Sequence, residues 1–207
     1  MEAAVAYGRS EAVLLGRRLE YFTIAWNSLE GIIAVGLGLL AGSVALVGFG
    51  LDSAIEVTSG AALLWRLSQD SASTSEQAER ITLKIVGWSF VALAAYVLYD
   101  SLVSLIARQA PERSVPGIVL AIASLIVMPL LARAKRKVAR NIGSAALIAD
   151  ARQTDFCTYL SAILVGGLGL NALLGWWWAD PVAGLLMVPI IGREGILAIR
   201  GHACCQC

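Results

Sequence analysis

The chain has 207 residues, of which 58% are hydrophobic and 15% charged, and its mean hydropathy is +0.74. A soluble domain carries roughly 25% charged residues, so this deficit indicates a protein of the lipid bilayer. The formal net charge is only +1, which argues against a broad basic surface for nucleic acid.

Residues 1–20 carry charges throughout and contain no clean apolar stretch. We therefore expect a cytosolic N-terminal segment here and no removable secretory signal. Six apolar stretches follow, each close to the roughly 20 residues that a helix needs to span a bilayer. They cover residues 21–42, 44–66, 82–107, 115–133, 145–171 and 178–199. The sequence thus predicts an all-α fold, with one domain of six transmembrane helices over residues 21–200 and a Cys-rich cytosolic tail over 201–207.

The predicted connections carry polar or conformationally special residues. Gly42-Ser43 gives a very tight first connection, and residues 68–79 form a Ser-rich polar loop. Residues 134–140 are strongly basic, which predicts a fourth connection outside the membrane. Three successive tryptophans at 176–178 mark the fifth connection, where an aromatic belt would lie at one membrane face.

Lysine and arginine are distributed unequally between the two sides of these predicted helices. If the N-terminus is cytosolic, 13 of the 16 basic residues fall on the inner side and two, Arg108 and Arg113, on the outer side. The remaining one, Arg152, lies inside a helix. Because basic residues favour the cytosolic side, we expect both termini in the cytosol and a location in the plasma (inner) membrane.

Four acidic residues lie deep within the predicted helices. Glu30 is about ten residues into the first, Asp52 and Glu56 share the second, and Asp155 is about ten residues into the fifth. At about 1.5 Å rise per residue, all four fall near the bilayer midplane. A charge at that depth is costly and usually marks an ion pathway or site. The alternative is a structural role, since Asp155 could pair with Arg152 across one turn.

Short motifs around these acids resemble the cation diffusion facilitator family. Residues 52–56 read Asp-Ser-Ala-Ile-Glu, similar to the two acids four apart in the family's second helix. Residues 151–155 match the fifth-helix motif at its second position, 180–181 read Asp-Pro as at the start of the sixth helix, and 42–46 resemble the entry to the second. The resemblance covers residues 20–200 and implies a short form that lacks the C-terminal cytosolic domain.

The resemblance also implies a metal site and its ligands. The carboxylates at family positions are Asp52, Glu56 and Asp155. Ala151 stands where the family carries His or Asp, so Glu30 or Asn27 is expected to complete the ligand shell. Zinc is the ion expected from the family, with manganese, iron and cadmium as alternatives, and no organic cofactor is expected. An all-oxygen site would instead suit manganese, magnesium or calcium.

Three further features contain side chains that could interact with cations. The tail residues His202, Cys204, Cys205 and Cys207 could capture a soft metal ion as an accessory site, or could be an unstructured end with an acylated cysteine. Asp100 and Asp180 lie at the outer ends of their helices and could draw cations to the outer mouth, although acids are common there. Cys157 is close to Asp155 in sequence but about 200° away around the helix, and we expect it to serve packing.

Together these patterns predict a divalent metal cation transporter that works by efflux and proton antiport. Its expected partners are metal ions, protons and membrane lipid, without nucleic acid, and a homodimer is left open. An intramembrane enzyme is disfavoured because no histidine lies in the membrane to act as a base. A metal-binding sensor or a structural membrane subunit is the alternative function.

Overall fold

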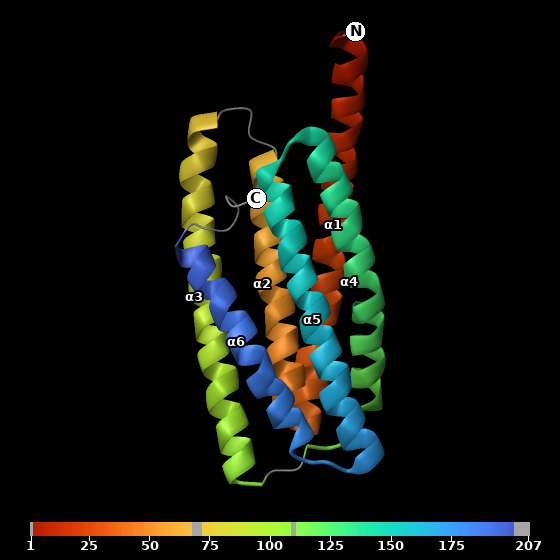
Figure 1. The fold of residues 1–207 in the computed structure, drawn as a ribbon, viewed down its shortest axis with the longest axis vertical. Helices are drawn as coiled ribbons and strands as arrows, with labels where there is room; N and C mark the ends of the chain where they lie inside the picture. The colour runs from red at the N-terminus through yellow and green to blue at the C-terminus, as the bar shows by residue number, and fades with distance from the viewer. Residues whose placement is uncertain (1, 68–71, 109–110, 201–207) are drawn as a thin grey trace.

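A computed structural model describes residues 2–67, 72–108 and 111–200, and in this part of the chain it consists of six helices (Figure 1). They are α1 (Glu2–Ala41), α2 (Val44–Leu67), α3 (Ala72–Ile106), α4 (Val115–Ile142), α5 (Ala145–Leu174) and α6 (Ala179–Ile199). Each contains a stretch long and apolar enough to cross a membrane. The predicted all-α fold with six transmembrane helices is therefore confirmed.

Two predicted connections are instead helical. α3 already begins at Ala72, within the expected polar loop, and α4 continues through the basic segment to Ile142. Lysine, arginine and alanine are strong helix formers, so the polarity of residues 134–140 does not interrupt the helix. α4 ends only where Gly143 adopts the left-handed conformation (φ 67°), and Ser144 then caps the N-terminus of α5.

Four helices form a bundle, and the other two form a pair beside it. α1 packs extensively on α2 and α4 on α5, with further contacts between α1 and α4 and between α2 and α5. α3 and α6 pack on each other and contact the bundle through α2 and α5 (Figure 1). Because the six helices alternate in direction, Glu2 and Arg200 lie toward the same end of the molecule.

Glycines allow the closest helix contacts. A Cβ on Gly50 of α2 would lie 2.8 Å from the backbone nitrogen of Val35 on α1. A Cβ on Gly87 of α3 would lie 2.9 Å from the carbonyl oxygen of Gly195 on α6. Small residues are common at such interfaces in membranes, where packing, and not expulsion of water, holds helices together.

The polarity of the molecule is arranged as a lipid environment requires. Large apolar side chains such as Ile32, Leu40, Ile106 and Leu173 are exposed. Polar and charged side chains are instead buried, among them those of Glu20, Thr23, Asn27, Glu30, Asp52, Glu56, Lys135, Asp150 and Thr154. Ionisable residues in membrane helices face the bundle interior when they serve an ion pathway or pair with one another.

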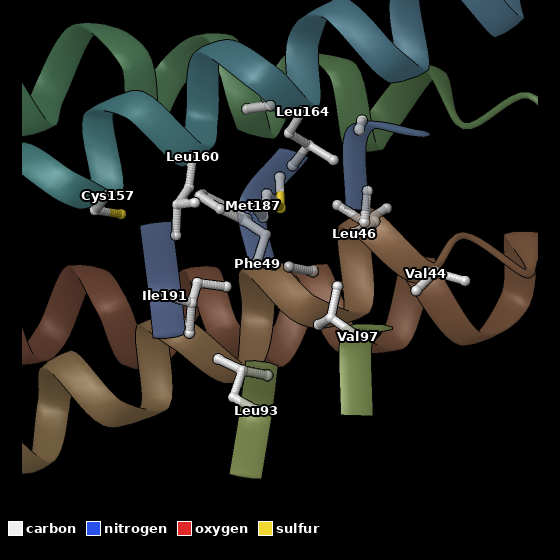
Figure 2. Packing of buried hydrophobic residues seen from close by; sticks show 14 of the residues in the cluster. Val44, Leu46, Phe49, Leu93, Val97, Cys157, Leu160, Leu164, Met187 and Ile191 are labelled. Atoms are coloured by element: carbon white, nitrogen blue, oxygen red, sulfur yellow. The ribbon is translucent and has the colours of Figure 1, made fainter. Parts of the chain in front are cut away.

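An apolar core fills the bundle on one side of these buried polar groups. Its members include Leu46 and Phe49 of α2, Leu160 and Leu164 of α5, and Met187 of α6 (Figure 2). Phe49 precedes Asp52 by one turn in α2. Phe49 and Leu46 therefore lie between the acids and the end of the bundle that the basic residues predict to be outside. A smaller apolar cluster lies toward the opposite end and contains Leu63, Val138, Ala139 and Leu147.

Candidate cation site

Three carboxylates lie inside the bundle at one level, from two helices. Glu30 of α1 and Glu56 of α2 are each 1% exposed, and Asp52 of α2 is 6% exposed. Asp52 and Glu56 share one face because they are one turn apart. The three side chains interact electrostatically with one another. We call Glu30, Asp52 and Glu56 the acid cluster.

Several oxygens of the acid cluster and its neighbour Asn27 have no hydrogen-bond partner among the described residues. They are both carboxylate oxygens of Glu30, Oε2 of Glu56 and Oδ1 of Asn27. Asn27 uses its amide nitrogen to donate to the carbonyl of Thr23 at 3.1 Å, which leaves its oxygen free. Buried polar atoms are rarely left unpaired, because their desolvation is costly. The Ser124 hydroxyl and the Trp26 indole nitrogen lie near Glu30 and are themselves unpaired within the part of the chain that the structure describes. A bound cation would satisfy the free oxygens and offset the negative charge.

Helix α5 faces the acid cluster with Thr154 and Cys157. The Thr154 hydroxyl donates to Oε1 of Glu56 at 2.7 Å. The Cys157 thiol is 1% exposed and lies within electrostatic reach of all three acids. Cys157 belongs to the apolar core, as the sequence predicts, and it also lies beside the acids. The signal was in the helical period, since Asp150, Thr154 and Cys157 follow a spacing of four and three that defines one face.

Asp155 occupies a different environment. Its carboxylate forms an ion pair with Arg136 of α4, and both side chains are 31% exposed. Thr154 turns inward, and the next helical position lies about 100° further around, which directs Asp155 toward α4. The structure thus does not bring Asp155 to the acid cluster, and it gives Asp155 a basic partner other than the expected Arg152.

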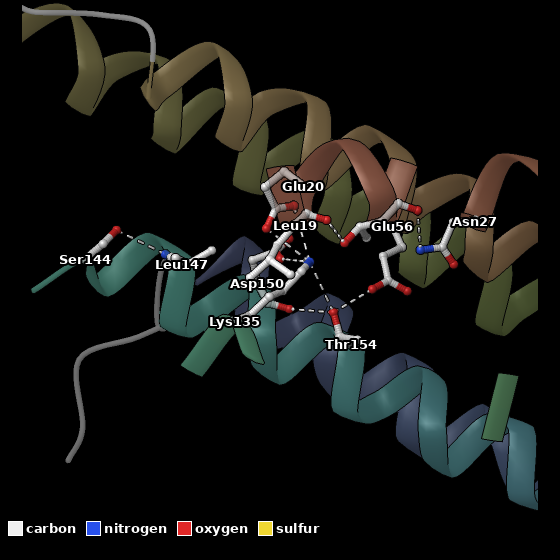
Figure 3. Close-up of polar contacts among 10 residues, drawn as sticks. Leu19, Glu20, Asn27, Glu56, Lys135, Ser144, Leu147, Asp150 and Thr154 are labelled. Atoms are coloured by element: carbon white, nitrogen blue, oxygen red, sulfur yellow. Dashed lines mark hydrogen bonds and ion pairs between the residues drawn. The ribbon is translucent and has the colours of Figure 1, made fainter. Parts of the chain in front are cut away.

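A second buried charge cluster lies beyond Thr154, toward the N-terminus of α5. Lys135 of α4 is fully buried, and its Nζ lies 3.2 Å from Oε1 of Glu20 on α1. The same ammonium forms an ion pair with Asp150 of α5 and lies 3.5 Å from the Thr154 hydroxyl (Figure 3). The sequence predicts Lys135 in a connection outside the membrane. Lys135 is instead in the interior because α4 extends past it to Ile142.

The two acids expected at the outer mouth have separate surroundings. Asp180 is fully buried, and its Oδ1 accepts a 2.5 Å hydrogen bond from the Ser43 hydroxyl just before α2. A carboxylate at this place stabilises the start of α2, because a helix N-terminus carries partial positive charge. Asp100 is half-buried, and Tyr96 donates to it at 3.5 Å. The burial of Asp180 and its bond to Ser43 favour this structural role over the attraction of cations to the outer mouth.

The candidate ligands among the described residues do not converge on a single point. Among the described residues, no three His, Cys, Asp or Glu side chains converge closely enough to hold a metal ion as they stand. Binding would therefore require the acid cluster to contract around the ion. The accessory ligands expected in the tail, His202, Cys204, Cys205 and Cys207, lie outside the described residues.

Comparison with known proteins gives both a family and relatives. Over 190 residues the chain is 28% identical to Transmembrane protein 163 of Xenopus laevis, and over 167 residues it is 28% identical to the magnetosome protein MamB of Paramagnetospirillum magneticum. An uncharacterized transporter of Synechocystis sp. is 24% identical over 160 residues. These matches cover 86%, 77% and 74% of this chain but only 64%, 56% and 52% of the relatives.

The family match spans nearly all of the helical region. The model of the cation efflux transmembrane domain matches residues 22–200, from early in the apolar part of α1 to the end of α6. The acid cluster, Lys135 and Asp150 lie within this range, and Glu20 lies just before it. Together with the six membrane-length helices, the match identifies an integral, multi-pass membrane protein. The chain belongs to the cation efflux transmembrane domain family.

Proposed function

We propose that the chain is a divalent metal cation transporter whose ion binds at the acid cluster. The observation that carries this proposal is the set of buried, unpaired carboxylate oxygens of Glu30 and Glu56 beside Asp52. Three carboxylates in a low-dielectric interior attract a divalent ion more strongly than a monovalent ion. Family membership and the transporter among the relatives support the same function.

The neighbours of the acid cluster bear on the choice of ion. Asp52, Glu56 and Glu30 offer hard oxygen atoms, whereas Cys157 offers a polarisable sulfur. A thiolate favours zinc, cadmium or iron over magnesium and calcium. We therefore propose zinc as the ion carried, with manganese, iron and cadmium as alternatives. Asn27, through its free Oδ1, is the further oxygen ligand, and Asp155 is assigned no direct contact with the ion.

The direction of transport is proposed from what lies on either side of the acid cluster. On one side lies the apolar core with Phe49 and Leu160, and on the other lies the polar cluster around Lys135, followed by a smaller apolar cluster near the ends of α2 and α4. The basic residues favour the polar side as cytosolic. In efflux, the metal ion then enters the acid cluster from the cytosol. Movement of the helices opens the apolar core and releases the ion outside, in exchange for protons.

A metal-binding sensor or structural subunit is the second candidate function. The missing preassembled metal site among the described residues favours neither function, because a transporter also changes shape around its ion. Metal uptake into proteoliposomes separates the two. The transporter accumulates zinc or cadmium inside sealed vesicles when an outward proton gradient, with the interior acidic, drives the exchange. Binding to the purified protein without any accumulation would support the sensor or subunit and contradict transport.

A further inference from the structure

The buried cluster around Lys135 contains two acidic side chains and one basic side chain. Glu20 and Asp150 each contribute a carboxylate, and Lys135 contributes one ammonium. All three side chains are nearly inaccessible, with exposures of 0%, 4% and 0%. Their elements are three different helices, α1, α5 and α4, so the two carboxylates converge on one point from separate sides. The cation at that point is the ammonium group of the Lys135 side chain.

The carboxylates retain unused coordinating capacity around the ammonium. Oδ1 of Asp150 has no hydrogen-bond partner among the described residues, and Oε1 of Glu20 has only its ion pair with Lys135. The Thr154 hydroxyl adds a third oxygen, 3.5 Å from Nζ. The set contains only oxygen donors, which suits a hard cation such as Mn²⁺.

We propose that Glu20 and Asp150 form a second cation site in which the Lys135 ammonium is the resident cation. A divalent cation takes the place of this ammonium when the ammonium is removed. This site is next to the acid cluster, because the Thr154 hydroxyl contacts both Lys135 and Glu56 (Figure 3). The tethered positive charge therefore repels an ion held at Glu56. The Lys135 ammonium also prevents the transported ion from binding to Glu20 and Asp150.

The proposal is tested by counting bound Mn²⁺ on the purified full-length chain, from the electron paramagnetic resonance signal of free Mn²⁺. Lys135→Met is measured in the natural background and in an Asp52→Asn background, which disables the acid cluster. We expect one more Mn²⁺ per chain than in the same background with Lys135 intact. Because the increment is what counts, this result does not depend on whether the acid cluster is the transport site.

Two control variants isolate the cause. Lys135→Arg keeps the resident charge and should add no Mn²⁺. The neutral triple variant Glu20→Gln/Lys135→Met/Asp150→Asn keeps the packing, removes the carboxylates and should also add none. No increment in a folded Lys135→Met protein overturns the proposal. If Lys135→Met folds only when Mn²⁺ is present, the cation is replacing the ammonium, as proposed. If it stays unfolded with and without Mn²⁺, the proposal is contradicted.

Discussion

The hydrogen bond between Thr154 and Glu56 tests how α5 takes part in cation binding. Thr154→Val keeps the branched shape of the side chain but removes the hydroxyl that donates to Oε1 of Glu56 at 2.7 Å. This bond fixes the carboxylate so that its unpaired Oε2 stays available to an ion. Loss of a partner that orients a metal ligand weakens metal affinity about 10-fold to 100-fold, or about 1.4 to 2.8 kcal/mol.

The effect on folding should be smaller than the effect on binding. Side-chain hydrogen bonds between membrane helices contribute about 0.6 kcal/mol on average, so the variant should remain folded. Zinc or cadmium titration of the purified protein, with circular dichroism to follow unfolding, measures both quantities. Thr158→Val is the matched control, because the Thr158 hydroxyl donates to the carbonyl of Thr154 one turn away, at 3.3 Å, and makes no bond to the acid cluster in the described part of the chain. Unchanged affinity in Thr154→Val, or an equal loss in both variants, would refute the reasoning.

Three further substitutions test separate parts of the structure. Cys157→Ser should lower the ratio of cadmium to manganese affinity by about 10-fold, because sulfur is replaced by oxygen; an unchanged ratio in competition titrations removes Cys157 from the site. Exchanging the partners, Asp155→Arg with Arg136→Asp, should restore the stability and uptake that either single change lowers; failure to restore uptake would make Asp155 an ion ligand. Gly87→Leu should destabilise the α3 and α6 pair by about 1–3 kcal/mol in thermal unfolding, and Gly36→Leu, with open space around it, should not.

The sequence predicts the membrane helices well because length and hydropathy determine them. The tight turn at Gly42 and Ser43 is found where the pattern places it, between Ala41 and Val44. The basic segment ending α4 was misassigned because charge was taken as a sign of a loop. A charged side chain such as Lys135 can lie in a helix and point inward when carboxylates from other helices surround it, and those partners are 115 and 15 residues away in sequence.

The acid cluster is predicted in part. Glu30, Asp52 and Glu56 are found at one level because depth follows directly from counting residues along a helix. Rotation about the helix axis is harder to read from spacing alone, and this is why Asp155 was grouped with them. The buried face of α5 runs through Thr154 and Cys157, and only the packing of α5 on α2 and α4 fixes that face.

Metal uptake by reconstituted vesicles tests the central claim most directly. The natural chain and Asp52→Asn, which removes one charge from the acid cluster while keeping its shape, are compared at equal protein and equal proton gradient. We predict zinc or cadmium accumulation by the natural chain and uptake at the level of empty vesicles for Asp52→Asn, with both proteins folded and monodisperse. Equal accumulation by the two proteins would contradict transport through the acid cluster.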